Sequence, residues 1–273
     1  MIGERLSKVL GQSVITENIT GASGSVAART VARATPDGHT LLVGNNTTHS
    51  ANVSLLKSLS YDPVGDFAPV IKIGLVGLIL AINNDLPIKD VLELIAYAKA
   101  NPGKLSYGSG SGSTRFATEM FMEMAGANLV HVPYRTNNQA LTDVMSGNIQ
   151  VLFGDAPVML PQVKAGNVKA LGVTGTQRLK LIPELPTIAE AGLPGFSLVG
   201  WIGLFAPANT PQPIVSRLNA EVRKMLSDPE FASRLIDVGI EADPTTPEQL
   251  GEWVVSETAR WSGIAKAAGI RPE

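Results

Sequence analysis

The segment LSYGSGSGSTRF, residues 105–116, decides the fold class. Leu105 to Tyr107 has the character of a strand, residues 108–113 form a loop of glycine and serine, and a helix follows with Phe116 and Phe121 on one face. A strand, a small-residue loop and an amphipathic helix make up the unit of an α/β domain with a parallel sheet. In such sheets the loops at the carboxyl ends of the strands line the ligand crevice.

The same alternation continues on both sides of this segment. It predicts helices and strands at regular intervals, with polar loops between them. The helices are expected at 2–10 and 27–34, in a helix ending at Gly147, and at about 212–227 and 247–268. The strands are expected at 13–19, 39–43, 71–82, 129–132, 149–153 and 169–173. The sequence therefore predicts an α/β protein in which both halves contain parallel sheets.

Two breaks, near 101–104 and near 206–211, divide the chain into lobes. The two C-terminal helices have no third α/β unit to complete, so we expect them to return to the first lobe. This organisation predicts a discontinuous lobe of residues 1–101 plus 206–273 and a second lobe of residues 102–205, with a ligand cleft between them.

Composition excludes several classes of protein. Of 273 residues, 44% are hydrophobic and 17% are charged, which is typical of a folded chain. A formal net charge of -2 lacks the basic excess of a nucleic-acid-binding protein. Cysteine is absent and the three histidines show no metal-ligand spacing, so the sequence predicts no metal site and no cofactor.

The longest apolar stretch, residues 71–82, is interrupted by Lys72, Gly74 and Gly77 and is too short to span a bilayer. The opening residues show neither the apolar core nor the cleavage site of a signal peptide. From the residues alone we expect either a cytoplasmic protein or one whose leader lies outside this sequence.

The glycine-rich loop is not one of the common nucleotide motifs. Ser113 occupies the position of the third glycine in Gly-x-Gly-x-x-Gly, no Gly-Lys-Ser/Thr follows, and the chain has no Gly-x-Ser-x-Gly. Instead the loop offers backbone N–H groups and hydroxyls at a helix N-terminus, which attracts anions. Ser113 or Thr114 is expected to cap that helix, and Arg115 in its first turn indicates a bound anion. The alternative is an ordinary turn with a surface arginine.

Other polar side chains also follow predicted strands. Asn46, Thr47 and Thr48 are neutral hydrogen-bonding residues, whereas Arg135 and Asp155 are charged. Together with the loop they suit a small carboxylate held by hydrogen bonds and one or two charges. No base is paired with a nucleophile and no paired acids lie on these loops, so we expect no catalysis.

These residues also carry a family resemblance. The blocks that carry it occur in order and at the expected spacing: NITGASGS (18–25), ATPDGHTLLVGNN (34–46), YDPVGDFAP (61–69), NPGKLSYGS (101–109), HVPYR (131–135), ALGVTG (170–175) and LPTIAEAGLPG (185–195). From about residue 2 to its end, the chain resembles the solute receptors of tripartite tricarboxylate transporters, the Bug or TctC-like proteins.

The resemblance implies a periplasmic solute-binding protein with a two-lobed, type II binding-protein fold. It implies reversible capture of a small organic acid, delivery to the membrane permease subunits, and no catalysis. Trp201 falls in an aromatic-Gly segment of the family, either edging the pocket or packing at the hinge, and Arg115 stands where the family often has histidine. The positions matching ligand-binding loops are Asn46, Thr47, Thr48, Ser109, Ser111, Ser113, Thr114, Arg115, Arg135 and Asp155.

Family members begin with a signal peptide and a strand that ends in a Pro-Gly-Gly loop before the first helix, whereas this sequence starts at about that helix. Because the loop would supply one wall of the carboxylate site, we expect this chain to bind more weakly than one that carries the strand.

Two other functions have weaker support. A ligand-sensing domain of a regulator would need a DNA-reading module, and an enzyme would need a reactive residue with a paired base. The ligand itself stays open among dicarboxylates, tricarboxylates, amino acids and aromatic acids, although two arginines favour a mono- or dicarboxylate. Asp155 either accepts a hydrogen bond from an amino or hydroxyl group of the ligand or only holds its own loop.

Overall fold

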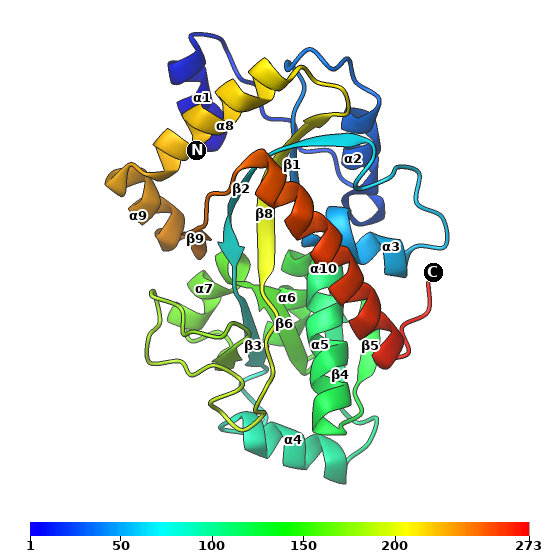
Figure 1. Ribbon diagram of the computed structural model, residues 1–273. Helices are drawn as coiled ribbons and strands as arrows, with labels where there is room; N and C mark the ends of the chain where they lie inside the picture. The colour runs from blue at the N-terminus through cyan, green and yellow to red at the C-terminus, as the bar shows by residue number, and fades with distance from the viewer. Residues whose placement is uncertain (273) are drawn as a thin grey trace.

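The computed structural model describes residues 1–272, whose strands divide between two sheets (Figure 1). The first sheet has the order β1-β8-β2-β9, and all its neighbouring pairs are antiparallel. Its strands are β1 (Leu42–Asn45), β8 (Gly200–Pro207), β2 (Phe67–Val76) and β9 (Ile240–Ala242). The parallel sheet expected in this half is therefore wrong, because β8 returns along the chain and lies between β1 and β2 in the opposite direction.

The second sheet has the order β5-β4-β6-β3-β7. Its strands are β5 (Val130–Pro133), β4 (Ser106–Ser109), β6 (Val151–Asp155), β3 (Leu78–Ile82) and β7 (Lys169–Val173). Strands β5, β4 and β6 are parallel, as the strand-loop-helix pattern predicts, whereas β3 is antiparallel to β6 and to β7. The α/β fold class is confirmed.

The apolar stretch expected to form one buried strand forms two. Strand β2 ends at Val76 in the first sheet, and β3 begins at Leu78 in the second, with Gly77 between them. A β-carbon on Gly77 would lie 2.8 Å from Leu179 Cδ2, so the crossing is closely packed. The division into two lobes stays a prediction. Because β2 belongs to the first sheet and β3 to the second, the arrangement of strands favours a boundary between the lobes at Gly77 rather than at residue 101.

The strand expected at Ser13–Ile19 does not form, and no regular element covers residues 13–20. Ile15 there is 81% exposed. The segment contains the β-branched residues Val14, Ile15 and Ile19, but it pairs with no strand of the first sheet, whose order begins with β1.

The expected helices form as α1 (Ile2–Leu10), α2 (Ser25–Ala32), α5 (Gly112–Ala125), α6 (Asn137–Met145), α8 (Gln212–Leu226) and α10 (Pro247–Ala267). The structure adds four helices that the sequence analysis did not predict, α3 (Asn52–Leu55), α4 (Val91–Ala100), α7 (Ala156–Lys164) and α9 (Pro229–Asp237). Two short turns, Ala22–Gly24 and the π-helical Thr47–Ala51, precede α2 and α3. Among the described residues, no helix has the length and apolar character needed to cross a bilayer.

Helix α10 contacts both halves of the molecule, running from the first sheet down to α5 (Figure 1). Its N-terminal half contributes Leu250 and Val254 to the core behind β1 and β8. Its C-terminal half contributes Trp261 to the largest core cluster, where the indole centroid lies 4.9 Å from the ring of Phe116 on α5. The helix packs against the first sheet, as expected, and it also contacts α5; its assignment to the first lobe stays a prediction.

Candidate functional site

The glycine-rich loop ends in a well-formed helix start. Strand β4 ends at Ser109 and α5 begins at Gly112, with Ser111 as the N-cap. The Ser111 hydroxyl accepts the backbone N–H of Thr114 at 3.4 Å, and the Ser111 N–H donates to the Thr114 hydroxyl at 3.3 Å. This reciprocal capping satisfies two N–H groups that a helix start leaves unpaired. The cap is therefore Ser111, rather than Ser113 or Thr114 as expected.

Gly110 lets this loop lie against the start of α6. A β-carbon on Gly110 would overlap the carbonyl carbon of Thr136 and the backbone nitrogen of Asn137, so no side chain fits there. The Gly110 N–H donates to Asn137 Oδ1 at 3.0 Å. The end of β4 and the beginning of α6 are thereby fixed to each other.

Asn137 joins three strand-end loops, and the sequence did not identify it. Its Nδ2 donates to Asp155 Oδ2 at 2.5 Å and lies 3.4 Å from Ser111 Oγ. Its Oδ1 also accepts from the Thr114 hydroxyl at 3.4 Å. The available signal was a cap residue, Thr136, followed by two asparagines on the connection that leaves β5 after Pro133, which places an amide near the carboxyl edge of the sheet.

In the half of the molecule that contains the first sheet, the chain is buried directly after β1, at Asn46, Thr47 and Thr48. Asn45 Oδ1 accepts the N–H groups of Thr47 and Thr48 at 3.0 and 3.1 Å, which shapes the turn. The Thr48 hydroxyl is engaged with the Asn45 backbone and so has a structural part. Asn46 Oδ1 accepts the backbone N–H of Trp201 at 3.2 Å, whereas Asn46 Nδ2 is buried with no hydrogen-bond partner among residues 1–272.

Trp201 lies in the core of the first half. Its side chain is fully buried, and its ring centroid lies 6.3 Å from those of Phe205 and His49. The two roles weighed for this residue are edging the pocket and packing at the hinge, and its full burial favours a packing role.

The polar residues that follow β1 and those that follow β4 meet at Gly112. A β-carbon on Gly112 would lie 3.0 Å from Ala51 Cβ and 3.1 Å from Thr47 Cγ2. The turn that carries Thr47 therefore lies directly against the N-terminus of α5. This contact brings the first-half residues beside Ser111, Ser113 and Thr114.

Ser109 is paired with a histidine that the sequence did not connect to it. Ser109 Oγ lies 2.7 Å from His131 Nε2, and the imidazole lies 5.0 Å from the Tyr107 ring. Because β4 and β5 are adjacent parallel strands, this hydrogen bond links them side chain to side chain. We therefore place Ser109 among the residues that hold the end of the sheet together.

The charged residues differ in their positions. Arg115 lies half-buried in the first turn of α5, whereas Arg135 is exposed on the loop before α6 and outside the hydrogen-bond network described above. Asp155 is the last residue of β6 and is partly buried. Burial raises the pKa of Asp155, and hydrogen bonds from Asn137 and from its own backbone N–H act in the opposite direction.

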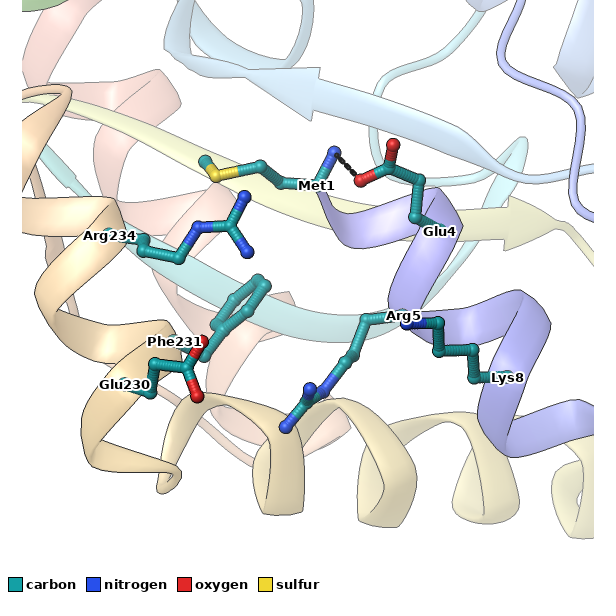
Figure 2. Close-up of a pocket in the computed structure, with 7 residues that line it drawn as sticks. All are labelled: Met1, Glu4, Arg5, Lys8, Glu230, Phe231 and Arg234. Carbon is teal, nitrogen blue, oxygen red and sulfur yellow. Dashed lines mark ion pairs between the residues drawn. The ribbon is translucent and has the colours of Figure 1, made fainter.

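Two small hollows lie elsewhere on the molecule. One of about 60 Å³ lies between α1 and α9, where side chains of both signs face each other (Figure 2). Its lining residues are Met1, Glu4, Arg5, Lys8, Glu230, Phe231 and Arg234. The other, of about 10 Å³, is lined by Leu160, Leu179, Lys180, Leu181, Ile236, Gly239 and Glu241. Neither contains a predicted site residue, and residues 1–272 hold no cluster of three or more side chains able to bind a metal.

Comparison with known proteins places the chain in a family. Residues 1–270 match the family described as tripartite tricarboxylate transporter family receptor. A relative from Pseudomonas sp. (strain P51), the UPF0065 protein in the tcbD-tcbE intergenic region, is 36% identical over 97% of this chain and 79% of its own length.

Two solved structures share the fold. Rpa4515 of R. palustris, solved with adipate, has a TM-score of 0.96 at 36% identity, covering 100% of this chain and 92% of that one. MatC (Rpa3494) from Rhodopseudomonas palustris, with bound malate, has a TM-score of 0.89 at 34% identity, covering 96% and 91%. The match over nearly the whole length of the chain confirms the resemblance, and this protein belongs to the tripartite tricarboxylate transporter receptor family.

Proposed function

We propose that this chain is a solute receptor that reversibly binds a small organic carboxylate. The observation that carries the proposal is the contact at Gly112, which sets the Thr47 turn against the capped N-terminus of α5. The ligand would lie where these two elements meet, and its carboxylate would face the first turn of α5.

The chemistry at this point suits an anion. Helix α5 has 14 residues, and the first N–H groups of a helix have no partner within it. Those N–H groups and the helix dipole together attract negative charge. Asn46 Nδ2 adds a buried donor without a protein partner, and a carboxylate oxygen would satisfy it.

Relatives support the class of ligand and the setting. Two solved relatives hold dicarboxylates, adipate and malate. The family consists of receptors of tripartite tricarboxylate transporters. We infer that this chain acts in the periplasm, delivers its ligand to the membrane permease subunits of such a transporter, and performs no catalysis.

A thermal-shift screen of the whole chain against a panel of mono-, di- and tricarboxylates tests the proposal. An acid at 100 times its dissociation constant adds about 2.7 kcal/mol to the free energy of unfolding, which raises the melting temperature by several degrees. A panel in which no acid raises the melting temperature would contradict the proposal.

Thr47→Val tests the location of the site. The variant removes a hydroxyl that makes no hydrogen bond among residues 1–272 and keeps the shape of the side chain. We expect a smaller ligand-induced shift with an unchanged melting temperature in the absence of ligand. Thr30→Val, an exposed position on α2, is the matched control and should keep the full shift.

A further inference from the structure

We propose that the acid bound here carries a hydroxyl or amino group in addition to its carboxylates. This group donates a hydrogen bond to Asp155, and Asn137 is the positioning residue that aims the Asp155 carboxylate at it. The inference rests on the proposed function, because it names the ligand class of the same site.

The side chain of Asp155 does not cap α7, the helix that follows it. It is the last residue of β6, paired with Leu78, and it precedes α7 at the N-cap position. An aspartate there commonly accepts the N–H groups of the helix start, yet its side chain makes no cap hydrogen bond. Its Oδ2 accepts from Asn137 instead, on the side of the Ser111 loop.

The orientation of the Asn137 amide is fixed by a group that can only donate. The backbone N–H of Gly110 lies 3.0 Å from Oδ1, and the Thr114 hydroxyl lies 3.4 Å from the same oxygen. Oδ1 therefore faces the α5 loop, and Nδ2 faces Asp155. Asp155 is thus the acceptor in this pair, and the hydrogen bond from Asn137 opposes the rise in the pKa of Asp155 that burial causes.

The Asp155 carboxyl group has acceptor capacity to spare. Its two oxygens offer about four lone-pair sites, whereas the protein supplies hydrogen bonds from Asn137 and from its own backbone N–H. Among residues 1–272, no lysine or arginine forms an ion pair with Asp155. Asp155 is partly accessible, so a ligand can reach it.

A spare acceptor beside a carboxylate-binding loop discriminates between acids. An unsubstituted diacid brings only negative charge toward Asp155 and leaves the spare lone pairs unsatisfied. A ligand O–H or N–H donates to them, and hydrogen bonds to a charged group are among the stronger ones. Sites built to accept such a hydrogen bond reject the analogue that lacks it, because a polar group that the bound ligand covers is then left unpaired.

Isothermal titration of the whole chain with matched trios tests the inference. The trios are succinate, malate and aspartate; glutarate, 2-hydroxyglutarate and glutamate; and adipate, 2-hydroxyadipate and 2-aminoadipate. In the trio that binds most tightly, we expect a substituted acid to bind at least about tenfold more tightly than its parent, equivalent to about 1.4 kcal/mol.

Variants assign the preference to the two residues. Asp155→Asn and Asn137→Ala should both reduce the ratio of dissociation constants between parent and substituted acid to less than about threefold, under 1 kcal/mol. The ratio is the readout because a general loss of stability weakens both acids alike. Asn138→Ala, at the exposed neighbouring position, is the matched control and should keep the full ratio.

The outcomes separate this inference from the function on which it rests. A wild-type chain that binds parent and substituted acids equally well overturns the inference and leaves the carboxylate receptor intact. A preference that survives in Asp155→Asn also overturns it. A chain that binds none of the acids overturns the proposed function and this inference with it.

Discussion

His49 is a fully buried imidazole directly after the residues proposed to contact the ligand. It stacks on Phe205 with ring centroids 3.8 Å apart and planes at 13°, and its Nδ1 lies 2.9 Å from Thr48 Oγ1. Gly44 leaves room for the ring, because a β-carbon there would lie 2.5 Å from His49 Cε1. Burial lowers the pKa of His49 to about 3, so the imidazole is neutral in the folded protein above that pH.

The lowered pKa of His49 makes stability depend on pH in the acidic range. Between about pH 3 and 6.5 the unfolded chain binds a proton at this position and the folded chain does not. The free energy of unfolding therefore rises with pH, by up to about 1.4 kcal/mol per unit from this group, and its contribution is constant above pH 6.5. Urea unfolding from pH 4 to 7 should show a shallower slope for His49→Gln.

The control for that slope is His39→Gln, at an exposed position. It should retain the wild-type dependence on pH. If the free energy of unfolding depends on pH equally in His49→Gln and in the wild type, protonation of this imidazole is not coupled to unfolding.

At the residue scale, the sequence predicted the positions but not the partners. Asn46, Thr47 and Ser111 follow strands, so their place at a sheet edge could be expected from local order alone. Asn137 could not be assigned its part, because that part depends on Asp155 and Gly110, which lie far from it or on another loop. Arg135 satisfied the same local rule and is exposed, since a strand-end position does not fix which way a long side chain points.

Among the elements, the loop before α10 is held to the first sheet by a buried lysine. Lys72 on β2 places its Nζ 2.8 Å from Asp243 Oδ2 and 3.9 Å from the Trp253 ring centroid. Its backbone N–H donates to the Thr245 hydroxyl. The Lys72 side chain is 6% exposed and that of Asp243 is 45% exposed. Removing Asp243 therefore leaves the buried charge of Lys72 unpaired, whereas removing Lys72 leaves the charge of Asp243 in contact with water.

This asymmetry predicts unequal costs for the two partners. Asp243→Ala leaves the Lys72 ammonium unpaired and buried, and we expect a loss of about 2 kcal/mol, reduced from the usual cost of breaking a buried pair by the exposure of Asp243. Lys72→Met keeps the packing on Trp253 and leaves Asp243 in water, so we expect less than about 1 kcal/mol. Urea unfolding at neutral pH measures both.

Asp237→Ala, at an exposed position at the end of α9, is the control and should change stability by less than about 0.5 kcal/mol. Equal losses for Asp243→Ala and Lys72→Met would mean that the environment of the lysine does not set the cost.

The same sheet shows why element prediction succeeded unevenly. The residue types of Ser13–Ile19 predicted a strand, but a strand forms only where another strand can pair with it. The apolar stretch 71–82 predicted burial correctly, but it forms the end of β2 and the whole of β3 instead of one strand. A local pattern gives no sign that the chain leaves one sheet at Gly77 and enters another.

The contacts between the two halves of the molecule include three separated places. Thr47 lies against Gly112, and Trp261 lies against Phe116. A β-carbon on Gly239 would lie 2.8 Å from Ala156 Cβ, directly after Asp155. Two of these contacts adjoin residues proposed to bind the ligand, so the relative placement of the halves sets the geometry of the site.

Gly112→Ala tests whether the contact between the halves builds the site. The added methyl would lie 3.0 Å from Ala51 Cβ and from Leu55 Cδ1, so the Thr47 turn must move away from α5 by a few tenths of an ångström. Folding should change little, because alanine offsets the strain with about 0.5–1 kcal/mol of helix preference. Affinity for the best acid of the panel should fall at least about tenfold, since misplaced donors lose their geometry. Gly263→Ala, with no atom within 4 Å of the new methyl, should keep full affinity. If Gly112→Ala also keeps it, the Thr47 turn and the α5 N-terminus do not form one site.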